Sequence, residues 1–157
     1  PLYLTSSFVF EDAEDMRTSF SEEKDRNIYS RFSNPNTSEL VEKICKMEGA
    51  ESGYAFAIGM AAVFSTCAAL LNSVDHIVSA RSVFVSTHTL FTKYFPKWNI
   101  STTYFDINKP ETIEDFITPK TKILYAESLT NPAIDIIDLE LLGNIDKKNN
   151  IKLIKNN

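Results

Sequence analysis

The sequence predicts an α/β fold built on a mostly parallel sheet with helices on both faces. Two observations predict it: strand-like apolar runs alternate with helical patterns, and the connections between them are short. The 157 residues, 43% of them hydrophobic, are enough for a sizeable core. Such sheets bind ligands at the carboxyl ends of their strands, so chemistry is expected after Ile58, Ala80 and Glu127.

The first third of the chain lacks this alternation of strands and helices. Asn36 is the expected N-cap of its longest helix, with Glu39 three residues later in the capping-box arrangement, and Gly49 marks the end of that helix. We therefore expect an N-terminal region over 1–50 and a sheet-bearing domain over 51–157. The elements expected before this helix are an extended arm over 1–10, a short helix over 11–20 and a polar loop over 21–37.

The rest of the chain follows a regular strand–helix pattern. Gly59 opens a helix that is apolar almost all round, so we expect it to be buried on most sides. The later helices are indicated by their 3.6-residue periodicity, and the strands by short runs of β-branched and aromatic residues. The expected strands are 54–58, 76–80, 101–107, 122–127 and 151–154, and the expected helices are 60–71, 88–98, 110–117 and 139–148.

Composition and charge argue against several classes of protein. The net charge of −5 and the absence of a polybasic run argue against nucleic-acid or membrane-surface binding, and no membrane span or secretion signal is seen. Cys45 and Cys67 lie in helical apolar patterns and are expected to be reduced thiols of a cytoplasmic protein. His76 and His88 lack the spacing of zinc ligands, so we expect structural roles for both and no metal site.

Two features could bind a phosphate. The turn at Gly59 and Met60 leads directly into a helix, whose first N–H groups attract anions, although a plain strand-to-helix turn can also carry a glycine. Tyr29 and Arg31 could add a hydroxyl and a guanidinium, because arginine binds phosphate in a bidentate manner. Pairing of Arg31 with a nearby acid is the alternative.

Two further residues could contact a planar ligand. Phe84 follows a strand and could stack on an aromatic ring, or it could simply belong to the core. Asn131 follows another strand and could hold a ring oxygen or a carboxylate with its amide, or it could only form an Asn-Pro turn. These signals are weak when they are taken singly.

Their order along the chain resembles one enzyme family. The pattern is similar to that of the pyridoxal-phosphate (PLP) enzymes of Cys/Met metabolism, and within the family to the O-succinylhomoserine and O-acetylhomoserine sulfhydrylases. The resemblance implies an aminotransferase-like large domain (PLP fold type I), truncated at its C-terminus. The segments that carry it are 1–8, 29–31, 34–35, 47–51, 59–62, 75–78, 79–95 and 130–132.

The resemblance implies a role for each candidate residue. Gly59 and Met60 would cradle the cofactor phosphate, Phe84 would stack on the pyridine ring, and Asn131 would bond near its phenolic oxygen. Tyr29 and Arg31 would reach the phosphate of a neighbouring subunit, which implies a homo-oligomer, expected to be a homotetramer. The implied activity is γ-replacement on an O-acyl-homoserine with sulfide to give homocysteine, in methionine biosynthesis. A cystathionine γ-synthase or γ-lyase is the alternative.

Several positions depart from the family pattern. Ile58 stands where Ser or Thr is usual, and Val74 and Val85 stand where glycine is usual, so both valine loops are expected to be strained or rearranged. Lys155 takes the place of the acid that pairs with the pyridinium nitrogen, which would weaken the electron sink. The Schiff-base lysine would lie beyond residue 157, so we expect no catalytic residue within this chain. A non-catalytic remnant is the remaining hypothesis.

Overall fold

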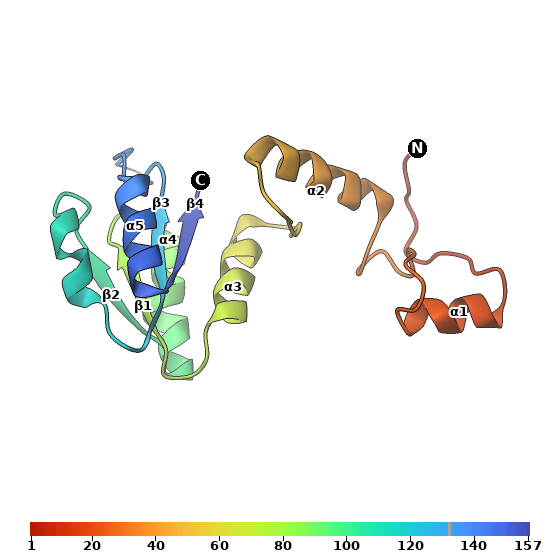
Figure 1. Ribbon diagram of the computed structural model, residues 1–157, viewed down its shortest axis with the longest axis horizontal. Coiled ribbons are helices and arrows are strands. Elements are labelled where there is room, and N and C mark those ends of the chain that lie inside the picture. Colours follow the sequence, from red (N-terminus) through yellow and green to blue (C-terminus); the bar gives the residue numbers. More distant parts are fainter. Residues whose placement is uncertain (132) are drawn as a thin grey trace. The chain divides into compact units, whose positions relative to one another are not determined.

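The computed structural model describes residues 1–131 and 133–157 (Figure 1). The chain forms two compact units, Pro1–Phe56 and Ala57–Asn157, which are described separately below. No helix among the described residues is long and apolar enough to cross a membrane.

The first unit contains two helices, α1 (Ala13–Phe20) and α2 (Pro35–Glu48). Helix α2 ends at Gly49, which has a positive φ of 63°, as predicted. The predicted N-cap was wrong, because the side chain of Asn34, and not that of Asn36, caps the helix by accepting the Asn36 N–H at 2.9 Å. Pro35 explains the shift, since its fixed φ suits the first helical position.

The extended arm pairs with the loop between the two helices. An isolated antiparallel bridge joins Ser7 to Tyr29, and the Ser30 N–H donates to the Ser6 carbonyl at 2.8 Å. The Asn34 amide also donates to the carbonyl of Tyr3 at 3.2 Å. The arm therefore fixes the backbone of the loop that carries Tyr29 and Arg31.

Asp15 is the charged centre of the first unit. Its buried carboxylate accepts from Lys24 at 2.6 Å, from the Glu11 N–H at 3.0 Å and from Arg26. The Lys24 bond, followed by the Glu11 N–H and then Arg26, lowers the pKa of Asp15 to about 2. These contacts join helix α1 to the loop that follows it.

We expect the first unit to lose stability in acid through Asp15. An unfolded aspartate has a pKa of about 3.9, so its stabilising effect is present above that pH and is lost as the pH falls through about 2. Hydrogen exchange of the α1 amides, followed from pH 5 to pH 2, measures this loss. In Asp15→Asn, these amides should exchange faster already at pH 5, because the ion pairs to Lys24 and Arg26 are absent. Asp25→Asn is the control, since Asp25 is exposed and forms no ion pair with the described residues, and an equal effect there would contradict the assignment.

The second unit confirms the predicted α/β fold. Its sheet has the order β2-β1-β3-β4, and every neighbouring pair of strands is parallel. The strands are β1 (His76–Ala80), β2 (Ser101–Phe105), β3 (Thr121–Glu127) and β4 (Lys152–Asn156). All five residues of β1 are buried, as befits a strand with neighbours on both sides.

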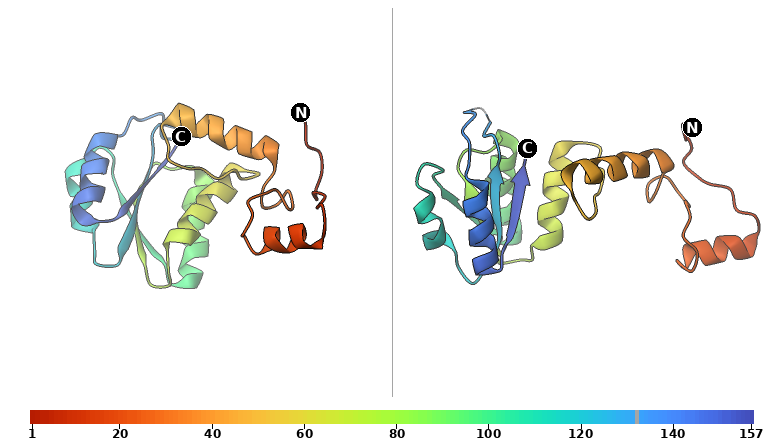
Figure 2. Two further views of the ribbon diagram at one scale, coloured as in Figure 1. Left: turned by 45° about the vertical axis from the view of Figure 1, so that its right-hand side comes forward. Right: turned by 45° about the horizontal axis from the view of Figure 1, so that its top comes forward.

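Helical segments cover both faces of this sheet (Figures 1 and 2). On one face, the ring of Phe91 contacts that of Tyr125 of β3 edge-to-face, with the ring centroids 5.1 Å apart. On the other face, a 2.6 Å ion pair from Lys148 to Glu114 joins the last helix of the chain to the helical segment after β2. The helix predicted over 88–98 begins earlier, at Val85, and passes through a π-helical turn. The segments are α3 (Gly59–Leu70), α4 (Val85–Thr89), η1 (Leu90–Tyr94), η2 (Phe95–Trp98), η3 (Pro110–Phe116) and α5 (Leu139–Asn149).

Two expectations about the start of this unit were wrong. Residues 54–58 form no strand, because no strand of the described chain pairs with them, and Tyr54 is 87% exposed. Helix α3 is buried along one side only, at Val63 and Cys67, whereas its opposite side is open. Both predictions assumed neighbours that the described residues do not provide.

The two histidines take structural positions, as expected. The ring of His76 bonds to the hydroxyls of Thr121 at 2.8 Å and Thr103 at 2.9 Å, and so links three neighbouring strands. His88 packs against Tyr104 with their ring centroids 5.1 Å apart. Both cysteines are free thiols in the structure.

Candidate functional site

The N-terminus of α3 offers unpaired donors at its first turn. Ile58 is the extended N-cap, and its side chain caps nothing, while the N–H groups of Ala61 and Ala62 bond back to its carbonyl. The N–H groups of Gly59 and Met60 find no acceptor among the described residues. A Cβ added at Gly59 would meet no atom within 4 Å, so the turn faces open space. This geometry suits an anion such as a phosphate.

Phe84 lies at the carboxyl end of β1, where it is the N-cap residue of α4. The residue is 38% exposed and is therefore not part of the buried core. Its backbone N–H donates to Oε1 of Glu127 at 3.0 Å. The loop is thus anchored through its backbone, and the ring remains available for a planar ligand.

The loop after β3 carries Asn131, which is exposed and whose amide bonds to no described residue. The loop is closed at its base by the Thr130 N–H, which donates to the Asp135 carbonyl at 3.1 Å. Pro132 of the predicted Asn-Pro turn lies outside the described residues. No side-chain bond of Asn131 within the described residues therefore supports the alternative, in which Asn131 only forms a turn.

Glu127 is the residue that sequence reasoning missed. It is only 3% exposed, and its Oε1 receives both the Phe84 N–H and the Asn156 amide, the latter at 3.3 Å. A charged residue that directly follows the apolar run 123–126 of β3 was the available signal. Within the described chain it forms no ion pair.

Lys155 lies beside this group in β4, paired with Ala126, while Asn156 pairs with Glu127. Because side chains alternate along a strand, Glu127 and Asn156 share one face of the sheet and Lys155 projects from the other. Lys155 is exposed and contacts no carboxylate in the part of the chain that the structure describes. It therefore does not neutralise Glu127.

Tyr29 and Arg31 belong to the first unit, whereas Gly59, Met60, Phe84 and Asn131 all belong to the second. The Arg31 guanidinium lies over the ring of Tyr29, 4.9 Å from its centroid, and is exposed. Among residues 1–131 and 133–157 it has no acidic partner, contrary to the alternative of an ion pair. The pair is open to an anionic ligand.

The two valines that replace glycine differ in conformation. Val74 has a φ of 71°, which is a strained value for a β-branched residue, as predicted. The expected strain at Val85 is not found, because Val85 is the first residue of α4 and has ordinary helical backbone. A helical position tolerates valine at a small cost in propensity.

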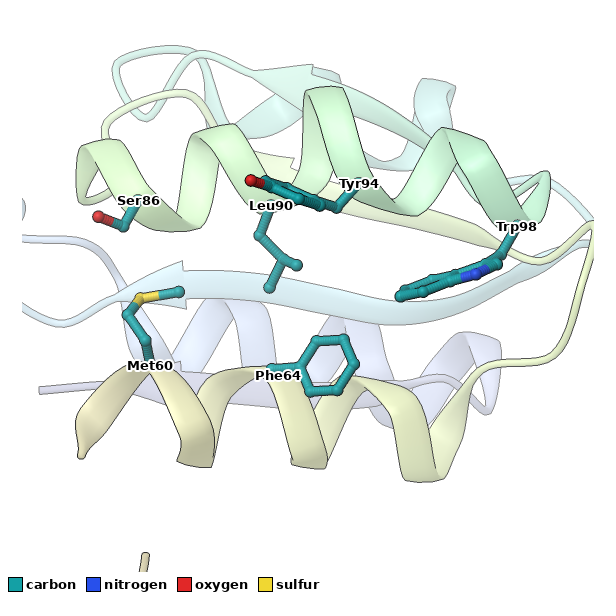
Figure 3. Close-up of a pocket in the computed structure, with 6 residues that line it drawn as sticks. All are labelled: Met60, Phe64, Ser86, Leu90, Tyr94 and Trp98. Carbon is teal, nitrogen blue, oxygen red and sulfur yellow. The ribbon is translucent and has the colours of Figure 1, made fainter. Parts of the chain in front are cut away.

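An apolar groove runs from Met60 along the surface of the second unit (Figure 3). Its volume is about 260 Å³, and it lies between α3 and the helical run 85–98. Figure 3 shows Met60 and Ser86 at one end, with Phe64 and Trp98 toward the other. It holds no acid–base pair. Its lining residues are Met60, Phe64, Ser86, Leu90, Tyr94 and Trp98.

Comparison with known protein families shows which family the chain belongs to. The family model of the Cys/Met metabolism PLP-dependent enzymes matches residues 1–157. The chain belongs to this family. Its expected cofactor, PLP, and its aminotransferase-like large-domain fold are thereby shown.

Relatives within the family catalyse more than one reaction. The chain is 38% identical over 144 residues to an O-succinylhomoserine sulfhydrylase of Pseudomonas aeruginosa, covering 92% of the chain and 36% of the relative. It is 39% identical over 129 residues to a cystathionine gamma-lyase of Bacillus subtilis, covering 82% of the chain and 34% of the relative. Membership therefore fixes the cofactor but leaves the sulfur chemistry open.

A solved structure shares the whole fold of the chain. The crystal structure of a putative O-acetylhomoserine (thiol)-lyase from Campylobacter jejuni, which contains a pyridoxyl-lysine phosphate, superposes with a TM-score of 0.93 at 33% identity. The match covers 100% of this chain and 39% of that one. The chain thus spans little more than a third of the length of these family members.

The residues of the second unit fit PLP in three respects. The N–H groups at Gly59 and Met60 are unpaired and open, as a phosphate requires. The exposed ring of Phe84 suits a planar heterocycle, and the free amide of Asn131 suits a ring oxygen.

Proposed function

We propose that this chain supplies the cofactor-binding part of an enzyme that replaces the γ-substituent of an O-acyl-homoserine with sulfide, giving homocysteine in methionine biosynthesis. The open N-terminus of α3 at Gly59 carries the proposal, because its unpaired N–H groups and the open space before them suit a phosphate. The similarity to an O-succinylhomoserine sulfhydrylase supports this choice of reaction.

Each residue has a defined task in this proposal. The N–H groups of Gly59 and Met60 bind the phosphate, Phe84 stacks on the pyridine ring, and Asn131 bonds near its phenolic oxygen. When PLP is bound, it supplies an electron sink for the negative charge that builds up at Cα and Cβ of the amino-acid substrate. Lys155 stands where the family pattern has an acid, and a cation close to the ring nitrogen would disfavour its protonation.

Tyr29 and Arg31 would complete the site of a neighbouring subunit. Their open arrangement, with the guanidinium free of carboxylates in the described chain, supports this role. The proposal therefore includes a homo-oligomer, with a homotetramer as its expected form. We place the reaction in the cytoplasm, in agreement with the free thiols of Cys45 and Cys67.

Cystathionine γ-lyase chemistry is the second candidate, and the Bacillus subtilis relative favours it. The complete gene product separates the two reactions. With an O-acyl-homoserine and sulfide, the proposed enzyme should release homocysteine. Formation of cystathionine with cysteine, or breakdown of cystathionine without the ester, would favour the alternatives.

Cofactor binding by the chain itself tests the site directly. We expect the 157-residue chain to bind PLP but not to turn over substrate, because none of its lysines matches the family's Schiff-base position. PLP should bind at least about 10-fold more tightly than pyridoxal, which lacks the phosphate, since about 1.4 kcal/mol corresponds to that factor. Equilibrium dialysis with both compounds measures the ratio. Equal affinities would contradict a phosphate site at α3.

A further inference from the structure

The carboxylate of Glu127 is buried at the carboxyl end of β3 and joins two segments that are distant in sequence. One oxygen, Oε1, accepts the N–H of Phe84 from the loop after β1 and the amide of Asn156 from the end of β4. The backbone reinforces the second link, because the Ser128 N–H donates to the Asn156 carbonyl at 2.9 Å. Oε1 of Glu127 thus connects the loop after β1 to the end of β4, at the edge of the sheet at which ligands bind.

The bond to Phe84 controls where its ring lies. Phe84 is the N-cap of α4, with an extended ψ of 138°, and it is not one of the buried core residues. The anionic oxygen of Glu127 is the one side-chain acceptor that the described residues offer to its N–H. Charge-assisted bonds of this kind are about twice as strong as neutral ones.

We propose that Glu127 is a positioning residue of the cofactor site, one that holds Phe84 by its backbone so that the aromatic ring lies flat on the bound pyridine ring. The inference rests on the proposed function, since it assigns Phe84 the stacking role. Glu127 itself touches neither cofactor nor substrate. Its charge remains available for this bond because Lys155 projects from the opposite face of the sheet.

Hydrogen exchange of the Phe84 amide tests the anchor without any cofactor. In the unmodified chain this amide should be protected. Glu127→Ala should accelerate its exchange by about 10- to 100-fold, the range expected for a lost bond to a charged group. Glu127→Gln keeps the shape and one acceptor oxygen, so it should fold normally and retain part of the protection, because a neutral acceptor forms a weaker bond. Unchanged exchange in Glu127→Ala would overturn the proposal.

Two matched variants show whether Glu127 alone accounts for the protection of the Phe84 amide. Asn156→Ala removes the second donor and should leave the Phe84 amide protected. If it releases that amide as fully as Glu127→Ala does, β4 holds the loop and the assignment is wrong. Glu111→Ala removes an exposed acid of η3 and should change nothing at Phe84, so a comparable release there would equally overturn it.

The orientation of the cofactor is the second readout. We expect the visible circular dichroism of bound PLP to weaken at least about 5-fold in Glu127→Ala at saturating cofactor, and to recover in part in Glu127→Gln. An unchanged signal would show that Glu127 does not position the stacking ring. If the unmodified chain binds no PLP, the proposed function fails, and the exchange of the Phe84 amide alone then decides whether Glu127 is the anchor.

Discussion

Gly59→Asp should reduce PLP affinity by about 100-fold or more while it stabilises the folded chain. The new carboxylate would lie at the N–H donors of α3, where it occupies them and repels the phosphate by roughly 1–4 kcal/mol at about 4 Å. The fold should gain about 0.5–1 kcal/mol, because an acid in the first helical turn suits the helix dipole and replaces a glycine. Binding by dialysis and stability by urea denaturation separate these opposite effects.

The matched control is Gly143→Asp within α5. This glycine is also surrounded by open space, so the same change adds the same charge without a steric clash. It should leave PLP affinity unaltered. If Gly59→Asp binds PLP as tightly as the unmodified chain does, the phosphate is bound elsewhere and the proposed site is wrong.

Val74→Gly should stabilise the second unit by about 1–2 kcal/mol. Val74 is the third residue of a turn closed by the Asp75 N–H and the Asn72 carbonyl, and its φ of 71° is a conformation that only glycine adopts without strain. The Asp75 carboxylate also accepts the Asn72 N–H at 2.6 Å, which keeps the turn closed despite the strain. Urea unfolding at neutral pH gives the difference in free energy.

Val85→Gly is the natural comparison, since both valines stand at glycine positions of the family pattern. Val85 begins α4 with helical backbone, so glycine there should destabilise the unit by about 0.5–1 kcal/mol. Opposite signs at the two positions are therefore expected. Stabilisation by both substitutions would mean that α4 does not start at Val85.

Local patterns were enough to predict most of the sheet. The strands β1 to β4 and helices α1, α2 and α5 all lie where apolar periodicity and caps placed them, with ends shifted by a few residues. The Asn36 cap failed for an equally local reason, because Pro35 moved the helix start by its own geometry. The residue that caps the helix, Asn34, lies two residues before the predicted one and directly before this proline.

The other wrong predictions, the strand over 54–58 and the burial of α3, depend on neighbouring elements that a local pattern does not reveal. The run over 54–58 has strand-like composition, but a strand also needs a neighbour, which cannot be read from the run itself. The same is true of α3, whose apolar composition does not say which sides are covered. For the candidate site, the turn at Gly59 was proposed from a strand over 54–58 that does not form, and Phe84 from its place after β1. Glu127 became visible only through its bonds to Phe84 and Asn156.

The order of the strands also governs how this chain can fold as it is synthesised. β1 occupies the interior of the sheet, but the strands that flank it, β2 and β3, both follow it in sequence. At roughly 5–20 residues per second, about 2–9 seconds pass between the appearance of Ala80 and that of Glu127. Until β2 has been synthesised, β1 has two unpaired edges, and the edge that β3 covers stays unpaired for the whole interval. Ribosome-bound chains that end before β3 should therefore be the species that chaperones recognise.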